Sequence, residues 1–258
     1  AAIGLHVGEM IGGIMTQYAQ PRPWLLLSEG GDNTYVSSAM PQKRNPGLLN
    51  NTRAEASDAV AAAEGVFLRA HNVVSGMMDG KSAGKNTGMA DTASSALTKL
   101  RRVIAGIVVN RDRALEELNL DWTASQEIAD QLMLKHGLPF RIHHMASAMV
   151  SWARAHDVRP SDFPYDEMKA LYRKEIESEF PDASPDLPMT EAEFHSCLDP
   201  KSILEKRQTA GSANPKETSA MLSEQEARIA WYRENTAMAR RRVASAHQAL
   251  ADAFDAIR

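Results

Sequence analysis

The sequence predicts an all-α fold, in which a long helical bundle is followed by a small helical C-terminal domain. No proline occurs between residues 47 and 138, and this stretch is rich in Ala, Leu, Met, Glu and Arg, which are good helix formers. Apolar residues within it recur at i, i+3 and i+4, the spacing that places them on one helix face. No segment of useful length alternates apolar and polar residues as a half-buried strand does.

The first domain is expected at residues 1–115. Helical spacing of apolar residues predicts a helix at the very start, which Pro21 and Pro23 end. A segment rich in glycine, proline and polar residues then predicts a loop over 24–46. Helices of 20 or more residues exceed the globular average and favour a bundle. The expected helices of this domain cover 1–20, 47–72 and 89–110, with a glycine-punctuated break at 75–84.

The second domain is expected at residues 116–258, where the elements shorten and prolines return. Gly137 stands in the C-cap position of a predicted helix, and Pro139 opens the next one. Thr190-Glu-Ala-Glu193 and Ser223-Glu-Gln-Glu226 have the spacing of capping boxes, and the latter predicts the start of a long final helix. Its inner stripe is expected to include Val243, Leu250, Phe254 and Ile257. The other expected elements are helices at 124–136 and 139–156 and an exposed linker at 181–188.

Composition excludes several classes of function. The net charge of −4 leaves no electrostatic footprint for nucleic acid or an anionic membrane surface. No apolar run approaches the roughly 18 residues of a membrane span, and no signal peptide is recognisable. Cys197 is the only cysteine, so we expect an inert thiol in a reducing, cytoplasmic compartment. His143 and His144 are neighbours on a predicted helix and point about 100° apart, so they cannot bind one metal ion together; no metal site is expected.

The most informative segment is Ser37–Pro46, which reads Ser-Ser-Ala-Met-Pro-Gln-Lys-Arg-Asn-Pro. Two hydroxyls are followed at fixed distance by two cations and an amide, on a predicted loop. Such a set can hold a small anion and move a proton. The residue types alone are equally consistent with a solvated turn.

This run resembles the fingerprint loop of the fumarase/aspartase superfamily, which includes argininosuccinate lyase, adenylosuccinate lyase and the carboxymuconate cycloisomerases. The loop usually has glycine before the serine pair, where this chain has Val36. Gly137-Leu-Pro-Phe-Arg-Ile-His143 resembles a segment of argininosuccinate lyases. Gln208–Pro215 resembles their Gly-Gly-Ser/Thr-Ala-Pro turn, here with Asn214 inserted. The resemblance therefore favours the argininosuccinate-lyase-like branch.

The resemblance implies that the chain is the C-terminal half of such an enzyme. Residues 1–115 would then be the second part of the central long-helix domain. The missing first half would carry a Thr-His segment that helps to bind substrate and supplies a proton, so this chain alone would lack part of the active site. The sequence opens without methionine, in the middle of a helical pattern, and is either a fragment or a natural truncation.

The activity implied is that of a carbon–nitrogen lyase, which removes an amine from an N-succinyl-type substrate and releases fumarate. The resemblance assigns Ser37 as general base. It assigns Ser38, Lys43 and Asn45 to the substrate carboxylates, and Met40 to packing against substrate or loop. It implies a homotetramer with shared active sites, no metal and no organic cofactor.

Two departures bear on the substrate. Argininosuccinate lyases have glutamate where this chain has Asn50, and Tyr-Asn-Lys-Asp where it has Met77-Met-Asp-Gly80. The amine is therefore expected to differ from arginine. The alternatives are an adenylosuccinate-lyase-like enzyme, a cycloisomerase, or a truncated, non-catalytic structural relative.

Overall fold

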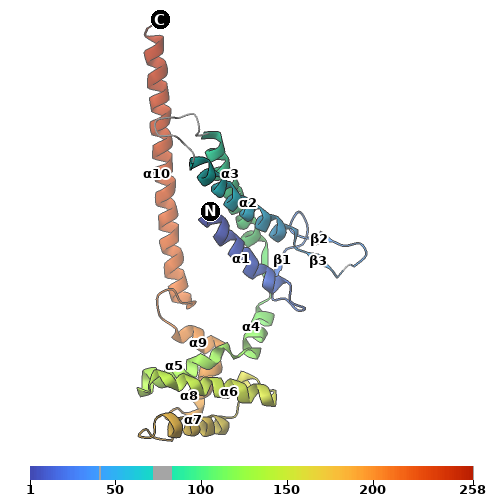
Figure 1. Ribbon diagram of the computed structural model, residues 1–258, viewed down its shortest axis with the longest axis vertical. Helices are drawn as coiled ribbons and strands as arrows, with labels where there is room; N and C mark the ends of the chain where they lie inside the picture. Colours follow the sequence, from blue (N-terminus) through green and yellow to red (C-terminus); the bar gives the residue numbers. More distant parts are fainter. Residues whose placement is uncertain (41, 72–82, 258) are drawn as a thin grey trace. The chain divides into compact units, whose positions relative to one another are not determined.

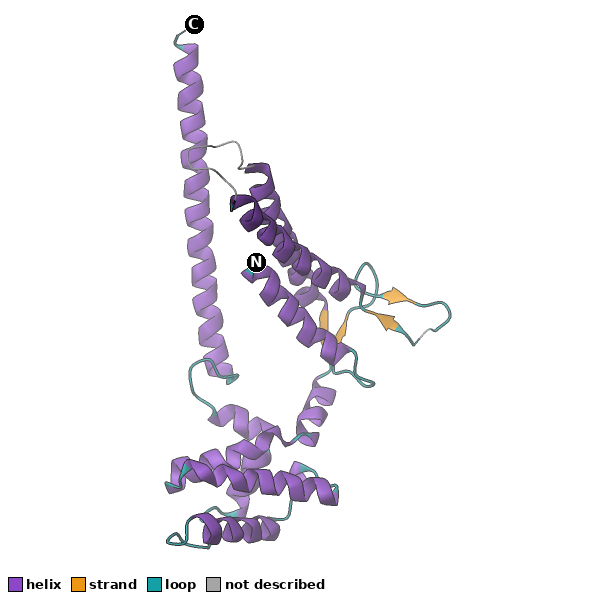
Figure 2. Cartoon of the chain, in the orientation of Figure 1, coloured by secondary structure: helices purple, strands orange, loops and turns teal. Residues whose placement is uncertain are grey.

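The structure is a computed structural model that describes residues 1–40, 42–71 and 83–257. Helices dominate it, which confirms the predicted all-α class (Figure 2). The chain divides into two compact units, Ala1–Glu117 and Leu118–Arg258. Among the described helices, none is both long enough and apolar enough to cross a membrane.

Three long helices build the first unit: α1 (Ala2–Tyr18), α2 (Gly47–Ala70) and α3 (Ala83–Gly106) (Figure 1). Their core is a cluster of buried aliphatic side chains, and small residues let α1 and α2 approach closely. A Cβ atom on Gly4 would lie 2.5 Å from the carbonyl oxygen of Ala56. The largest fully buried side chains of this core include Ile11, Leu48 and Leu49. The short helix α4 (Arg111–Leu120) follows.

Two small antiparallel pairs of strands accompany these helices. Strand β1 (Leu25–Leu27) pairs with β4 (Ile107–Val109), and β2 (Tyr35–Val36) pairs with β3 (Arg44–Asn45). The loop predicted over 24–46 therefore contains three short strands, β1, β2 and β3, which the prediction missed. The helix predicted over 89–110 is present as α3, with different bounds. Strands of two or three residues are too short to produce a readable alternation, and α3 begins earlier and ends at Gly106.

The second unit packs short helices around an aromatic core. Phe163 and Phe194 are fully buried with ring centroids 6.1 Å apart, and the Trp152 ring meets Phe163 edge-on at 5.0 Å. Helix α7 and the turn before α6 were not predicted. The elements of the unit are η1 (Trp122–Ala124), α5 (Ser125–His136), η2 (Phe140–Ile142), α6 (His143–His156), η3 (Pro160–Asp162), α7 (Tyr165–Glu179), α8 (Glu191–Leu198), α9 (Pro200–Lys206) and α10 (Pro215–Asp255).

The helix-end predictions succeed where a side chain or a glycine conformation decides the end. Gly137 caps α5 at φ 68°, a left-handed conformation that glycine adopts without strain. Thr190 and Glu193 form the predicted capping box of α8. Ser223 does not start the last helix. Helix α10 begins at Pro215, because the Asn214 side chain accepts a hydrogen bond from the Lys216 amide and Pro215 is pre-set for a first helical position.

Helix α10 has no buried residue within this chain. The stripe predicted to face inward is exposed here, with Leu250 57% and Phe254 65% accessible. Positions spaced by seven along it hold the apolar residues Leu222, Ile229, Val243 and Leu250, and the repeat is interrupted by Thr236. A repeat of seven is the pattern of a helix that packs lengthwise against another helix.

Candidate active site

The Ser-Ser run forms the outer part of a β-hairpin. Tyr35 pairs with Asn45 and Val36 with Arg44, so that Ser37 to Lys43 join the two strands. Pro41 lies outside the described residues. Figure 1 shows β2 and β3 extending away from the helices of the first unit. The hairpin thus brings all five predicted site residues onto one projection.

The Ser37 hydroxyl accepts a hydrogen bond from the backbone N–H of Met40, with 3.3 Å between the atoms. The backbone N–H of Lys43 in turn donates to the Met40 carbonyl at 2.9 Å. Ser37 is half-buried, whereas Ser38, Met40 and Lys43 are exposed. Within the described part of the chain, the Lys43 ammonium has no hydrogen bond or ion pair. A backbone N–H aimed at Ser37 Oγ stabilises negative charge on that oxygen, and Lys43 is left available for a bound anion.

Asn45 has a structural contact that sequence reasoning missed. Its side-chain Nδ2 donates to the Tyr35 carbonyl across the hairpin at 3.1 Å. This bond occupies one of the two N–H donors and fixes the plane of the amide. The second N–H and the Oδ1 atom remain available for a substrate. The pairing of Asn45 with Tyr35 could be found only once the hairpin register was known.

The base of the hairpin is closely packed. The Tyr35 ring lies over Gly47, where a Cβ atom would come within 2.1 Å of the ring. Asp32 forms an ion pair with Arg102 of α3 at 3.3 Å. A side chain at position 47 would therefore displace the ring of Tyr35 from this place, and the ion pair holds the approach to the hairpin against α3.

Tyr18 ends α1, and its buried hydroxyl has no hydrogen-bond partner among the residues that the structure describes. Burial raises the pKa of Tyr18, with the positive charge of Arg44 opposing the shift and the negative charge of Glu29 adding to it. The phenol is therefore neutral at physiological pH, and it lies within electrostatic reach of a residue on β3.

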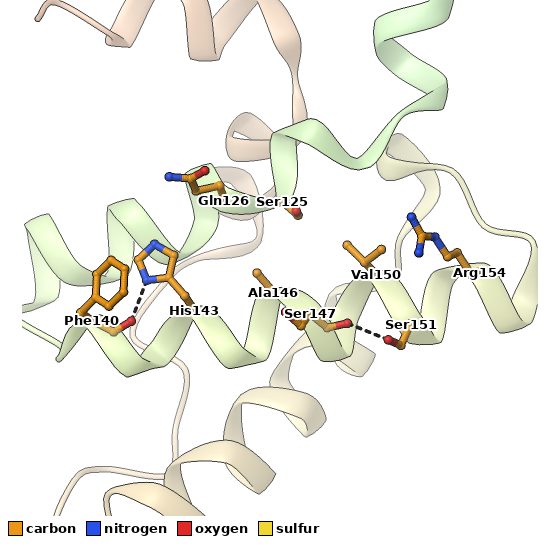
Figure 3. Close-up of a pocket in the computed structure, with 9 residues that line it drawn as sticks. All are labelled: Ser125, Gln126, Phe140, His143, Ala146, Ser147, Val150, Ser151 and Arg154. Atoms are coloured by element: carbon orange, nitrogen blue, oxygen red, sulfur yellow. Dashed lines mark hydrogen bonds between the residues drawn. The ribbon is translucent and has the colours of Figure 1, made fainter.

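The second unit contains a separate groove of about 550 Å³ between α5 and α6 (Figure 3). His143 lies toward one end and the exposed Arg154 toward the other. The imidazole of His143 is hydrogen-bonded to the Phe140 carbonyl at 2.7 Å and meets the Asp130 carboxylate at 3.1 Å. These bonds support the predicted structural role of His143. Among the described residues, no group of three or more potential metal ligands comes together.

Cys197 is buried in the core of the second unit. Burial raises the pKa of its thiol to about 11. The thiol is therefore protonated and shielded at neutral pH, as an inert structural cysteine is.

Comparison with known proteins shows which enzymes this chain resembles. A family model described as argininosuccinate lyase C-terminal matches residues 122–205. The argininosuccinate lyase of Bacillus subtilis (strain 168) is 27% identical over 205 residues, which cover 77% of this chain and 41% of that protein. The argininosuccinate lyase of Methanothermobacter thermautotrophicus is 26% identical over 191 residues, which cover 70% of this chain and 38% of that protein.

The fold is shared with solved structures of EDDS lyase. A variant with bound fumarate matches with a TM-score of 0.82 at 18% identity, over 96% of this chain and 48% of that one. A complex with formate matches with a TM-score of 0.80 at 18% identity, over 95% of this chain and 48% of that one. The chain thus spans less than half the length of these relatives. The family model over residues 122–205, the sequence relatives and the common fold agree with the fingerprint of the hairpin. Together they support the resemblance of this chain to the fumarase/aspartase superfamily, in its argininosuccinate-lyase-like branch.

Proposed function

We propose that this chain supplies the catalytic hairpin of a carbon–nitrogen lyase, which eliminates an amine from an N-succinyl-type, aspartate-derived substrate and releases fumarate. The observation that carries the proposal is the hairpin itself. It presents two serine hydroxyls, an ammonium with no partner among the described residues and an oriented amide, with a backbone N–H on Ser37 Oγ. Kinship with argininosuccinate lyases supports the reaction class.

In the proposed reaction, Ser37 removes the proton from the carbon next to a substrate carboxylate. The electron pair of that C–H bond is held briefly as an aci-carboxylate, which carries extra negative charge. It then forms the carbon–carbon double bond as the C–N bond breaks and the amine leaves. Lys43, Ser38 and the free N–H of Asn45 donate to the charged carboxylates, and Met40 packs beside them. Donors held in place before the reaction are the main source of such stabilisation.

The proton that the leaving amine needs would come from outside this chain. The resemblance to this family assigns the supply of that proton to a Thr-His segment in the N-terminal half of such enzymes. The proposed reaction requires neither a metal ion nor an organic cofactor, because the side chains named here and that segment perform each proton transfer and hold each charge.

The amine is proposed to differ from arginine. The observation is the pair of departures from argininosuccinate lyases: Asn50, which is exposed in the first turn of α2, and Met77–Gly80, which lie outside the described residues. In the sequence of the second segment, a thioether and a carboxylate replace a phenol and an ammonium that would contact the amino-acid end of the substrate. Structures of EDDS lyase share the fold, and one holds fumarate, which supports a fumarate-releasing relative with a different amine.

The assembly is proposed to be a cytoplasmic homotetramer whose active sites are shared among subunits. Large apolar side chains that are exposed in this chain support it, and they lie on the long helices: Leu5 and Met10 on α1, Phe67 and Leu68 on α2, Ile104 on α3 and Trp231 on α10. Exposed apolar surface of this extent marks an interface.

The test is direct detection of fumarate by its ultraviolet absorbance. The protein, expressed with any native upstream sequence, would be mixed with a panel of N-succinyl amines, and the reverse reaction run with fumarate and diverse amines. Ser37→Ala should lower kcat by at least about 10³-fold while KM changes little, because the general base is lost and the binding groups remain. The matched control is Ser57→Ala, which removes an exposed hydroxyl from the outer face of α2.

Turnover retained in Ser37→Ala would show that another group is the base. Silence of the wild-type enzyme across the whole panel, in both directions, would favour the non-catalytic relative. Faster turnover of an adenylosuccinate-type substrate than of every other compound in the panel would favour the adenylosuccinate-lyase-like alternative.

A further inference from the structure

Asn33 lies at the root of the hairpin and forms hydrogen bonds through its side chain, its backbone N–H and its backbone carbonyl. Its side-chain Nδ2 donates to the Ser28 carbonyl at 3.2 Å and lies 3.0 Å from the Ser28 hydroxyl. Its backbone N–H donates to the Gly30 carbonyl at 3.2 Å. Gly30 and Gly31 take positive φ values of 92° and 56°, which lets the chain turn back so that Asn33 reaches Ser28.

The backbone carbonyl of Asn33 also completes the start of α2. The first N–H groups of a helix have no acceptor within the helix and need one from elsewhere. The N-cap residue here is Pro46, which offers no side-chain acceptor. The Leu48 N–H instead donates to the Asn33 carbonyl at 3.2 Å, and Leu48 is buried. The backbone carbonyl of Asn33 thus replaces the side-chain acceptor that an N-cap residue usually provides.

Ser28, the partner of the Asn33 side chain, is itself fixed to α3. Its backbone N–H donates to the carbonyl of Gly106 at 2.8 Å, continuing the pairing of β1 with β4. Gly106 has no side chain. A Cβ atom added there would lie 3.5 Å from Asn33 Nδ2 and 3.5 Å from Ser28 Oγ. Through Ser28, Asn33 is therefore tied to the end of α3 as well as to the first turn of α2.

These bonds fasten both strands of the hairpin at one residue. On the outgoing side, Asn33 precedes Tyr35 by two positions and Ser37 by four. On the returning side, Asn45 lies three positions before Leu48. We propose that Asn33 is a positioning residue for the lyase reaction: its side-chain amide sets the root of the hairpin and thereby the location of Ser37 and Asn45 relative to α2. The inference rests on the proposed function of the hairpin.

The expected effect is on the chemical step. A displacement of about 1 Å in a catalytic group costs up to about 10²-fold in rate, even when the substituted residue is remote from the chemistry. Asn33→Asp keeps the size and the backbone carbonyl but removes the Nδ2 donor, so it isolates the side-chain bonds to Ser28. Asn33→Ala removes the whole amide. Ser28→Ala removes one of the two acceptors and should have the smallest effect.

The experiment combines hydrogen–deuterium exchange of the backbone amides with steady-state kinetics on the full-length enzyme. In Asn33→Asp and Asn33→Ala, exchange should become faster in the peptides covering 33–37 and 44–48 and stay unchanged in the second unit. The value of kcat should fall about 10- to 100-fold with less than about a threefold change in KM. The matched control is Asn51→Ala, an exposed asparagine on α2 that should change neither quantity.

Unchanged exchange in both Asn33 variants would overturn the inference, whatever the kinetics show. Faster exchange with unchanged kcat would show that Asn33 anchors the hairpin without positioning the reaction, and would also overturn it. A wild-type enzyme that releases no fumarate would refute the proposed function and with it the catalytic part of the inference, while the exchange result would still decide whether Asn33 anchors the hairpin.

Discussion

At the scale of single residues, Cys197 makes the stability of the second unit depend on pH. Burial raises the pKa of this thiol from an ordinary value of 9.0 to about 11. Below pH 9 the thiol is protonated in both the folded and the unfolded chain, so its contribution is fully present. As pH rises from 9 to 11, only the unfolded chain releases the proton. The free energy of unfolding then falls, by an amount on the order of 3 kcal/mol for a shift of this size.

The measurement is urea denaturation of the wild-type chain and of Cys197→Ala at intervals between pH 8 and 11. The variant should be less stable at pH 8, because a buried side chain is shortened, but should lose less stability on the alkaline side. Lysines and tyrosines titrate in the same range in both proteins, so the difference between the curves isolates the thiol. Parallel curves would contradict the prediction.

The candidate site was predictable residue by residue only where the residues are neighbours in sequence. Ser37, Ser38, Met40, Lys43 and Asn45 lie within nine positions, so a fingerprint could bring them together without knowledge of the fold. Whether they act as predicted is still a prediction. The bonds from Asn33 to Ser28 and Leu48 follow from a turn at two glycines and from a helix that begins after proline. Neither the turn nor this helix start produces a residue pattern from which these bonds could be predicted.

At the scale of elements, the contact of α1 with α2 depends on Gly4. A Cβ atom there would lie 2.5 Å from the Ala56 carbonyl oxygen and 2.9 Å from a methyl group of Val60. Because the Ala56 oxygen belongs to the backbone, Gly4→Ala would force the two helices apart. We expect a loss of about 1–3 kcal/mol in the free energy of unfolding.

The control for this prediction is Gly12→Ala on the same helix, where an added Cβ atom meets nothing within 4 Å. That change should stabilise α1 by about 0.5–1 kcal/mol, because alanine is the better helix former. Thermal denaturation followed by circular dichroism measures both. Two shifts of the same sign and size would show that the close approach at Gly4 does not limit the packing.

Long helices were predictable as elements, and short strands were not. A helix such as α2 repeats its apolar spacing over several turns, so tertiary contacts do not have to be known. The pairing of β1 with β4 depends on a partner far away in sequence and involves three residues on each side. The start of α10 was misplaced because Ser223 has the spacing of a capping box, whereas Asn214 and Pro215 hold the true beginning.

At the scale of the whole molecule, the exposed apolar side chains predict association. Helix α10 buries none of its residues within the chain, although positions spaced by seven hold Leu222, Ile229, Val243 and Leu250, with Thr236 interrupting the repeat. A helix with this repeat gains stability by packing against another. Light scattering coupled to size-exclusion chromatography should therefore give a mass near four times that of one chain, which is 28.3 kDa. A mass of one chain at micromolar concentration would contradict the proposed tetramer.

The pairing of β1 with β4 has a consequence for how the protein folds. Leu27 and Ile107 are paired although 80 positions separate them in the sequence, so this contact closes a long loop of chain. Closing such a loop costs entropy before any contact inside it can compensate, and distant contacts of this kind slow folding. The main helix contacts of both units, such as α1 with α2, α2 with α3 and α5 with α6, join successive helices and close shorter loops. Since Ser28 and Gly106 meet at the end of the same strand pair, we expect the root of the hairpin to acquire its native geometry late, after α2 and α3 have formed.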